Sequence, residues 1–309
     1  MKATATRLLM TFATGSLIGL GFVLAKLLLT GGLSQTTMSL LQVGGATAVM
    51  FVVMRLQGVG LPANGTTARY FIVSASIGVL AGPLLGNWVI ARIPSGTFTL
   101  LLTLSPMFTA LIGAALDRRW PELHTLAGSA IGLTGAALVL VPGAEALRPE
   151  QALAMSVAIG VPLLLAIGNV YRSRRWPSGL APPAAASGTL LTQFLVLAPI
   201  AVPAGLDVSS VLSAWPLLAL LILTTVAGNL AGAVLQKTAG PTAYSQIGYV
   251  IALTGVAASS FLFGEELGVL FWPGLFLVFA GVLLTNSPSL PRRLEAALSL
   301  NLLPLSNKR

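Results

Sequence analysis

The 309-residue chain contains no cysteine and one histidine, His124. Without thiols it can form no disulfide, no thiolate metal site and no thiol nucleophile. A single histidine beside a charged turn cannot build a metal cluster or a catalytic triad. No apolar stretch carries paired carboxylates or a phosphate-binding loop. We therefore expect no catalytic residues, no metal and no cofactor, and the chain is predicted not to be an enzyme.

Charge is also scarce. Charged residues make up 8% of the chain and hydrophobic residues 55%, whereas a soluble domain carries about 25% charged residues. A surface that faces water cannot be built from so few charges, which excludes a soluble two-domain enzyme and a disordered chain. The net charge of +9 comes from basic residues between apolar runs, which indicates orientation in a lipid bilayer rather than binding to nucleic acid.

The few charged residues divide the chain into ten long apolar runs. Because a helix rises ~1.5 Å per residue, ~20 residues cross the ~30 Å hydrocarbon core of a membrane. Each run here is long enough to cross once, and none is long enough to cross twice. The sequence therefore predicts an all-α polytopic membrane protein with ten transmembrane helices. The runs without Asp, Glu, Lys or Arg are 8–25, 27–54, 70–91, 93–116, 123–144, 151–171, 176–206, 208–236, 238–264 and 267–291.

Basic residues are distributed unevenly between the two ends of these runs. If the connections are assigned alternately to the two sides, fourteen Lys and Arg fall on the side of the amino terminus. Only three fall on the other side, namely Lys26, Arg92 and Arg148. Positive charge accumulates on the cytoplasmic side of membrane proteins. We expect a multi-pass protein of the bacterial inner membrane with both termini in the cytoplasm.

An internal repeat accompanies this pattern. Four glycine pairs recur at one offset of 146 residues, which makes each half about five helices long. An odd number of helices inverts the second half in the membrane, as in many secondary transporters, whose substrate site lies between the halves near the midplane. We predict two inverted five-helix repeats, 1–147 and 148–290, and a cytoplasmic tail, 291–309. The pairs are Gly82 with Gly228, Gly86 with Gly232, Gly128 with Gly274, and Gly135 with Gly281.

The ends of both halves carry a family resemblance. The stretch 105–116 followed by 126–135, and the stretch 263–267 followed by 273–284, resemble the end of the EamA-type repeat. The chain is thereby similar to the EamA-type transporters of the drug/metabolite transporter (DMT) superfamily, and most of all to the YddG-like amino-acid exporters. The resemblance implies ten helices in two halves and a transport function. The family's arginine in the second helix is replaced here, where the aligned region offers Gln42.

Candidate binding residues follow from what the apolar runs contain. All acids lie at run ends or in loops, and Lys26, Arg92 and Lys237 end runs, where their side chains can extend to the membrane surface. The pocket is therefore expected to be uncharged. Polar and aromatic groups within a run should face the bundle, either to bind substrate or to bond neighbouring helices. The substrate-binding candidates are Gln42, Trp88, Thr99, Thr103, Asn169, Asn229, Tyr244, Gln246 and Tyr249.

These features favour a secondary transporter that exports small polar or amphipathic metabolites, most of all amino acids, by alternating access. Two alternatives stay open, which are a multidrug exporter of the same superfamily and an integral-membrane enzyme acting on lipid. The expected partners are a small-molecule substrate and the bilayer, and the chain is expected to be a monomer. Because no carboxylate is expected at mid-membrane, transport without a proton or sodium gradient is the preferred mechanism.

Overall fold

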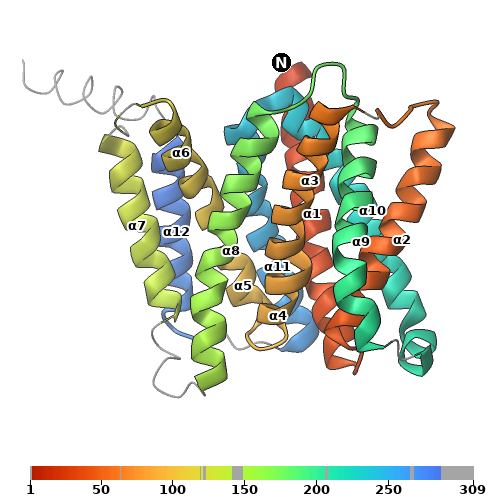
Figure 1. Cartoon of the computed structure of the whole chain (residues 1–309). Helices are drawn as coiled ribbons and strands as arrows, with labels where there is room; N and C mark the ends of the chain where they lie inside the picture. The colour runs from red at the N-terminus through yellow and green to blue at the C-terminus, as the bar shows by residue number, and fades with distance from the viewer. Residues whose placement is uncertain are drawn as a thin grey trace, which may run out of the picture.

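All regular elements in the computed structural model are helices, within the residues that the structure describes, 2–62, 64–118, 120, 123–140, 149–205, 208–264 and 268–286. Most of them stand side by side in one bundle with short connections at its two ends (Figure 1). The elements are α1 (Lys2–Thr30), α2 (Gln35–Leu56), α3 (Gly65–Val79), the π-helix η1 (Leu80–Gly86), α4 (Asn87–Ile90), α5 (Ser95–Leu101), α6 (Leu104–Leu116), α7 (Leu123–Leu140), α8 (Pro149–Arg174), α9 (Pro182–Ala201), the 3-10 helix η3 (Val202–Ala204), α10 (Val208–Ser245), α11 (Ile247–Phe263) and α12 (Phe271–Asn286).

Among the described residues, seven helical stretches are long and apolar enough to cross a membrane. Three shorter helices are also apolar, within α7, α11 and α12. The all-helical, multi-pass class predicted from sequence is confirmed, while the count of ten spans stays a prediction. The predicted boundary between the halves at 147/148 and the predicted tail 291–309 lie outside the described residues. The seven stretches are Leu9–Thr30, Gln35–Leu56, Gly65–Ile90, Ser95–Leu116, Gln151–Arg174, Pro182–Ala201 and Val208–Ala239.

The helix ends differ from the apolar runs at one place. The sequence predicts separate helices in 208–236 and 238–264, with Lys237 between them, but α10 continues past Lys237 to Ser245. The ammonium of Lys237 donates to the backbone oxygen of Leu180 at 2.9 Å, so this charge is bound at the bundle surface and does not end the helix. The break falls instead at Gln246, the residue between α10 and α11.

Pro83 explains the widened turn η1. Proline has no amide hydrogen and crowds the preceding turn, so it cannot sit in a regular helix interior. Here the chain forms a π-helix around it. The backbone oxygen of Pro83 accepts hydrogen bonds from Gln35 Nε2 and Ser39 Oγ of α2, both at 3.2 Å. Asn87, just after the π-helix, donates to Ser39 Oγ at 2.9 Å. Such π-turns are frequent at functional sites, and this one brings backbone and amide polarity into the bundle.

A seam of glycines joins α7 and α12, which stand side by side at the left edge of the bundle in Figure 1. A Cβ atom built on Gly135 would lie 2.6 Å from the backbone oxygen of Gly274. One built on Gly281 would collide with backbone atoms of Gly128 and Gly132. Small residues of this kind allow membrane helices to approach closely. The seam therefore depends on the absence of side chains at these positions.

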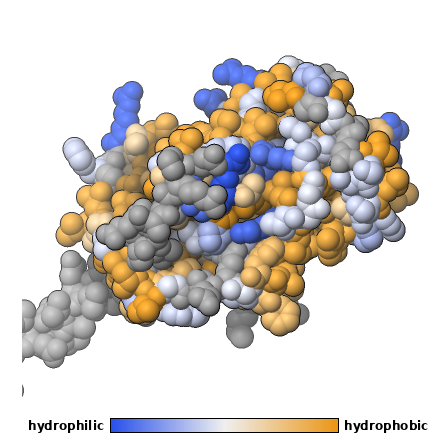
Figure 2. All heavy atoms as spheres, turned by 90° about the horizontal axis from the view of Figure 1, so that it is seen from below, coloured by the Kyte–Doolittle hydropathy of each residue, from blue (hydrophilic) through white to orange (hydrophobic). Residues whose placement is uncertain are grey.

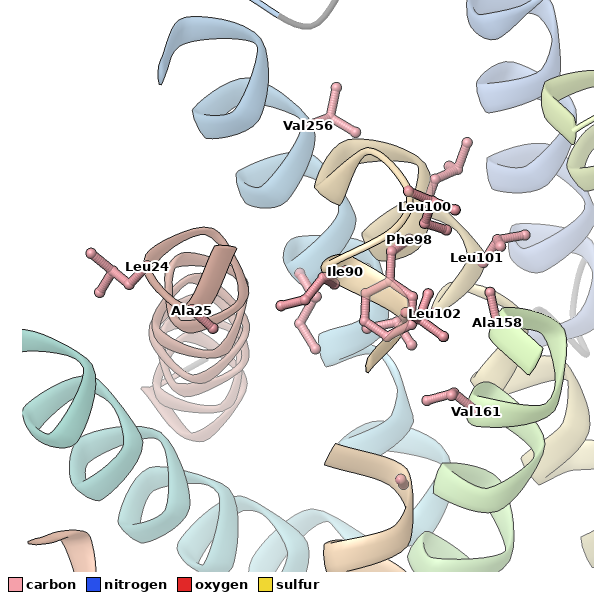
Figure 3. Packing of buried hydrophobic residues seen from close by; sticks show 14 of the residues in the cluster. Leu24, Ala25, Ile90, Phe98, Leu100, Leu101, Leu102, Ala158, Val161 and Val256 are labelled. Atoms are coloured by element: carbon pink, nitrogen blue, oxygen red, sulfur yellow. The ribbon is translucent and has the colours of Figure 1, made fainter. Parts of the chain in front are cut away.

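The main apolar core lies where α1, α4, α5, α8 and α11 meet (Figure 3). Phe98 is fully buried at its centre, among Ile90 and Leu102, and its ring meets that of Phe22 edge to face at 5.2 Å. Thr99 is also fully buried on α5, and Thr103 in the turn after it. Both hydroxyls donate to backbone oxygens three residues earlier, Gly96 and Leu100, so these threonines are satisfied within their own turns.

Helix packing in the bundle is reciprocal when elements 146 residues apart are compared. The 146-residue offset relates α1 to α8, α2 to α9, α3 to α10 and α6 to α11. α1 packs on α11, and correspondingly α8 packs on α6. α1 also packs along α10, as α8 does along α3 and η1. α3 packs on α9, as α10 does on α2. Each of these contacts thus has a counterpart in which elements of the two parts of the chain exchange places.

Candidate functional site: a polar cavity inside the bundle

Three adjoining cavities lie inside the bundle. Cavity A has a volume of about 120 Å³, cavity B about 200 Å³ and cavity C about 100 Å³. Ile18 lines all three, Asn229 lines A and B, and Arg172 and Tyr244 line A and C. Because neighbouring cavities share lining residues, together they make one irregular central space. On the face seen from below, hydrophilic residues gather near the middle, with apolar residues on either side (Figure 2).

Cavity A lies toward the end of the bundle where α8 ends and α3 begins. Arg172, in the last turn of α8, is half-buried and supplies its positive charge. The guanidinium donates from Nε to Gln236 Oε1 at 3.2 Å and from Nη2 to Asn169 Oδ1 at 2.8 Å. Gln236 Nε2 in turn donates to the backbone oxygen of Asn169 at 3.2 Å. The two amides therefore hold the guanidinium at the cavity wall.

Aromatic rings form the other wall of cavity A. Tyr70, Trp176 and Tyr244 all line it. The Tyr70 ring stacks on that of Tyr171 with centroids 6.2 Å apart and meets the Trp176 indole at 5.9 Å. Trp176 Nε1 donates to the backbone oxygen of Leu180 at 3.1 Å, which fixes the indole. These aromatic rings therefore line the same cavity as the Arg172 guanidinium.

Cavity B lies against the π-turn. Pro83, Asn87 and Gln42 line it from the first half of the chain, and Thr225 and Asn229 from the second. Gln42 Nε2 donates to Thr225 Oγ1 at 2.9 Å, which joins α2 to α10. Asn229 Nδ2 donates to the backbone oxygen of Thr225 at 2.8 Å. The lining is neutral, and its amides present both donors and acceptors.

Cavity C is lined by a buried serine hydroxyl that has no hydrogen-bond partner among the described residues. Ser105 of α6 lines it together with Asn169, Arg172 and Tyr244. Ser105 is 5% exposed, and its buried Oγ has no hydrogen-bond partner among the described residues. A buried hydroxyl without a partner costs ~1–3 kcal/mol, and such groups are few in native proteins. This hydroxyl is available to a ligand in the cavity.

The structure brings together four of the nine candidates predicted from sequence and separates the other five from the cavities. Gln42, Asn169, Asn229 and Tyr244 line the central space. The residues that line none of the three cavities are Trp88, Thr99, Thr103, Gln246 and Tyr249. Substrate binding by any of the nine stays a prediction.

Each of the five has a different local setting. The indole of Trp88 is covered by the Arg92 guanidinium, 4.2 Å from the ring centroid. Thr99 and Thr103 are in the apolar core. Tyr249 packs against the Phe279 ring at 5.9 Å, and Gln246 lies at the junction of α10 and α11. Apart from Gln246, these settings are those of groups that pack against their neighbours or are satisfied within their own helix.

Sequence reasoning missed Arg172, and the expectation of an uncharged pocket was wrong for cavities A and C. Arg172 directly follows an apolar run, a position typical of a connection between helices. One signal in the sequence could have found it. Arg172 and Lys26 are separated by the repeat offset of 146 residues, so each half carries one basic residue at the same position of its first helix.

Lys26 itself is bound near the opposite end of the bundle. Its ammonium donates to the backbone oxygen of Ile93 at 3.1 Å and lies 5.3 Å from the centroid of the Phe263 ring. Lys26 lines none of the three cavities. Within the part of the chain that the structure describes, no group of three His, Cys, Asp or Glu side chains could hold a metal ion.

Comparison with known proteins relates the first part of the chain to a family of transporters. Residues 6–141 match the sequence model of the EamA-like transporter family. This stretch is an EamA-like transporter domain, which confirms the resemblance to the DMT superfamily. A crystal structure of another protein has the same fold, with a TM-score of 0.68 over 94% of this chain and 99% of that one. Sequence identity to it is 18%, so this likeness concerns the fold alone.

A curated relative carries a more specific name. The "Probable terminal-alkyne amino-acid exporter" of Streptantibioticus cattleyicolor is 34% identical over 87 residues. The aligned part is 27% of this chain and 29% of the relative, so the similarity spans less than a third of that protein. The family and the relative are both transporters and not enzymes.

Proposed function

We propose that the protein is a secondary transporter that exports small polar or amphipathic metabolites, most of all amino acids, by alternating access. The observation that carries this proposal is the central space lined from both halves of the chain by amides, phenols and one guanidinium. The EamA-like domain supports it independently. A site between the halves is where such transporters bind their substrates.

An inverted repeat of two five-helix halves accounts for the packing. The glycine seam supports it best, because Gly128 and Gly135 in α7 are the repeat counterparts of Gly274 and Gly281 in α12. Gly135 meets Gly274, and Gly281 meets Gly128. A two-fold axis that exchanges the halves turns the first contact into the second, as an isologous interface requires. The seven candidate spans and three shorter apolar helices would then be ten transmembrane helices.

The lining favours an amino acid over the two alternatives. Arg172 repels the cations that many multidrug exporters would have to accept, and it attracts a carboxylate. The rings of Tyr70, Trp176 and Tyr244 suit an apolar side chain on that molecule. A lipid-modifying enzyme has no support in the comparisons, which point to transporters.

The orientation proposed for the inner membrane, with both termini in the cytoplasm, can be tested with single cysteines because the chain has none of its own. Thr30 and Gln57 flank α2 and are exposed. In intact cells, a membrane-impermeant maleimide should label Thr30→Cys at once. Gln57→Cys should be labelled only after the membrane is permeabilised. Labelling of both from one side would show that α2 does not cross, and the opposite pattern would reverse the orientation.

Transport itself is tested with the purified full-length protein in liposomes. We expect labelled amino acids, including a terminal-alkyne amino acid such as propargylglycine, to move down their own gradient. The flux should need neither a pH gradient nor sodium, because the central space contains no carboxylate among the described residues that line it. Liposomes without protein give the leak. Saturable flux of lipophilic cations but of no amino acid would support the multidrug alternative, and strict dependence on a proton gradient would reject uncoupled transport.

A further inference from the structure

Arg172 has the position and chemistry of an anchor for an anionic group. It is the residue that brings a charge to both cavity A and cavity C. Its side chain donates to Gln236 and Asn169 from Nε and Nη2, while a guanidinium has five N–H donors in a planar fork. Donors therefore remain for a ligand. A fork of this kind matches the two oxygens of a carboxylate.

The surroundings of Arg172 orient its charge without cancelling it. The oxygen atoms that accept its bonds belong to Asn169 and Gln236, which are neutral amides and each 5% exposed. Gln236 is held in turn through its Nε2 by the Asn169 backbone oxygen and by Ser173 Oγ at 3.3 Å. Arg174, two residues further on, differs because it pairs with Asp117 at 2.8 Å. The amides thus prepare Arg172 for an anion that arrives from elsewhere.

A second and independent observation points to a ligand at the same place. Ser105 shares cavity C with Arg172, and its buried Oγ has no partner among the described residues. A ligand oxygen that accepts the Ser105 O–H would satisfy this group. Ser105 lies on α6 and Arg172 on α8, so the two donors come from different halves of the chain. Tyr244 lines the same cavity and adds a ring surface.

We propose that Arg172 binds the carboxylate of the transported molecule, with Ser105 as a second donor and with Asn169 and Gln236 as positioning residues. The substrate class is then small carboxylic acids with an apolar side chain, amino acids among them, rather than amines. This assignment rests on the proposed transport function. It names the part of the substrate that the cavity recognises.

Equilibrium binding to the purified full-length protein in detergent tests the anchor without requiring transport. The probes are labelled L-leucine, L-leucinol, in which a hydroxymethyl group replaces the carboxylate, and 4-methylpentanoate, which lacks the ammonium. The wild-type protein should bind L-leucine and 4-methylpentanoate more tightly than L-leucinol. In Arg172→Gln, the Kd for L-leucine should rise at least about tenfold, since hydrogen bonds to charged groups are strong, while the Kd for L-leucinol, a cation that Arg172 repels, should not rise.

Two further variants guard against a simple folding defect. Arg172→Lys keeps the charge but loses the fork, and it should fall between the wild type and Arg172→Gln. Ser105→Ala removes only the hydroxyl, and it should weaken L-leucine several-fold while leaving the melting temperature unchanged or higher. The matched control is Arg175→Gln, which removes one positive charge three residues along at an exposed position and should bind all probes as the wild type does.

The outcomes separate the two proposals. Binding of L-leucine without flux in liposomes would reject the transport function and leave the anchor standing. Flux with an unchanged L-leucine Kd in Arg172→Gln would reject the anchor and leave transport standing. Wild-type protein that does not prefer L-leucine to L-leucinol would also overturn the anchor. If neither L-leucine nor L-leucinol binds to either Arg172 variant, Arg172 is needed for the folded structure of the bundle and not for binding a carboxylate.

Discussion

Replacing Gly281 by alanine should separate α7 from α12 and lower the stability of the folded protein by about 1–3 kcal/mol, the usual cost of inserting a methyl group into close packing. The added Cβ would collide with backbone atoms of Gly128 and Gly132. Backbone cannot rotate away as a side chain can, so the two helices have to move apart. The expected result is a lower melting temperature of the purified protein in detergent. Gly135→Ala should act in the same way, because its Cβ would meet the backbone oxygen of Gly274 and the amide nitrogen of Val278, both at 2.6 Å.

The control for this seam is Gly113→Ala in α6. A Cβ on Gly113 would meet no atom within 4 Å, and alanine favours helix over glycine by about 1 kcal/mol. Gly113→Ala should therefore melt at the wild-type temperature or above it. Equal stability of Gly281→Ala, Gly135→Ala and the wild type would mean that α7 and α12 do not pack through these glycines, and the reciprocal contact between the halves would lose its best support.

The all-helical, multi-pass class was predictable because it depends on the length and apolar character of whole segments. The offset of 146 residues, which is visible in the amino-acid sequence alone, also relates the glycines of α7 to those of α12 that form the seam. The helical membrane class and the repeat are each inferred from a pattern that extends over many residues. A wrong assignment at one position, such as the break expected at Lys237, does not change them.

The cavity lining was less predictable because it depends on the direction of single side chains. Asn87 and Trp88 are neighbours, yet Asn87 lines cavity B and Trp88 stacks under Arg92. Successive residues in a helix point about 100° apart, so membership of an apolar run does not tell which of them faces the cavity. Tyr244 and Tyr249 are separated by the break at Gln246, and only Tyr244 lines the central space.

Arg172 was missed for a related reason. A basic residue at the end of a membrane helix is expected to extend outward to the water. Side chains in helices, however, lean back toward the amino-terminal end. From the last turn of α8, Arg172 therefore reaches Asn169 one turn earlier and enters the bundle. The amide of Gln236 on α10 makes that direction favourable, and no pattern in the local sequence reveals this partner.

Gly82 offers the sharpest test of whether the central space is the transport path. Its sequence spacing from Gly86 favours a role in close helix packing, but a Cβ on Gly82 would meet no atom within 4 Å. Gly82 instead lines cavity B, whose volume is about 200 Å³. A larger side chain at this position can enter the cavity without displacing the backbone. The fold should therefore tolerate a substitution that obstructs the cavity.

Gly82→Leu should reduce the flux of a labelled amino acid in liposomes by at least about tenfold, a change equal to about 1.4 kcal/mol in the barrier, while its melting temperature stays near that of the wild type. The isobutyl group would occupy part of cavity B, which Gln42 and Asn229 also line, and would leave less room there for a substrate. Gly160→Leu is the matched control, because a Cβ on Gly160 also meets nothing within 4 Å and Gly160 lines none of the three cavities. It should transport as the wild type does. Wild-type flux in Gly82→Leu would place the substrate path outside cavity B, whereas loss of flux in both variants would show that bulk in a helix, and not obstruction of the cavity, slows the transporter.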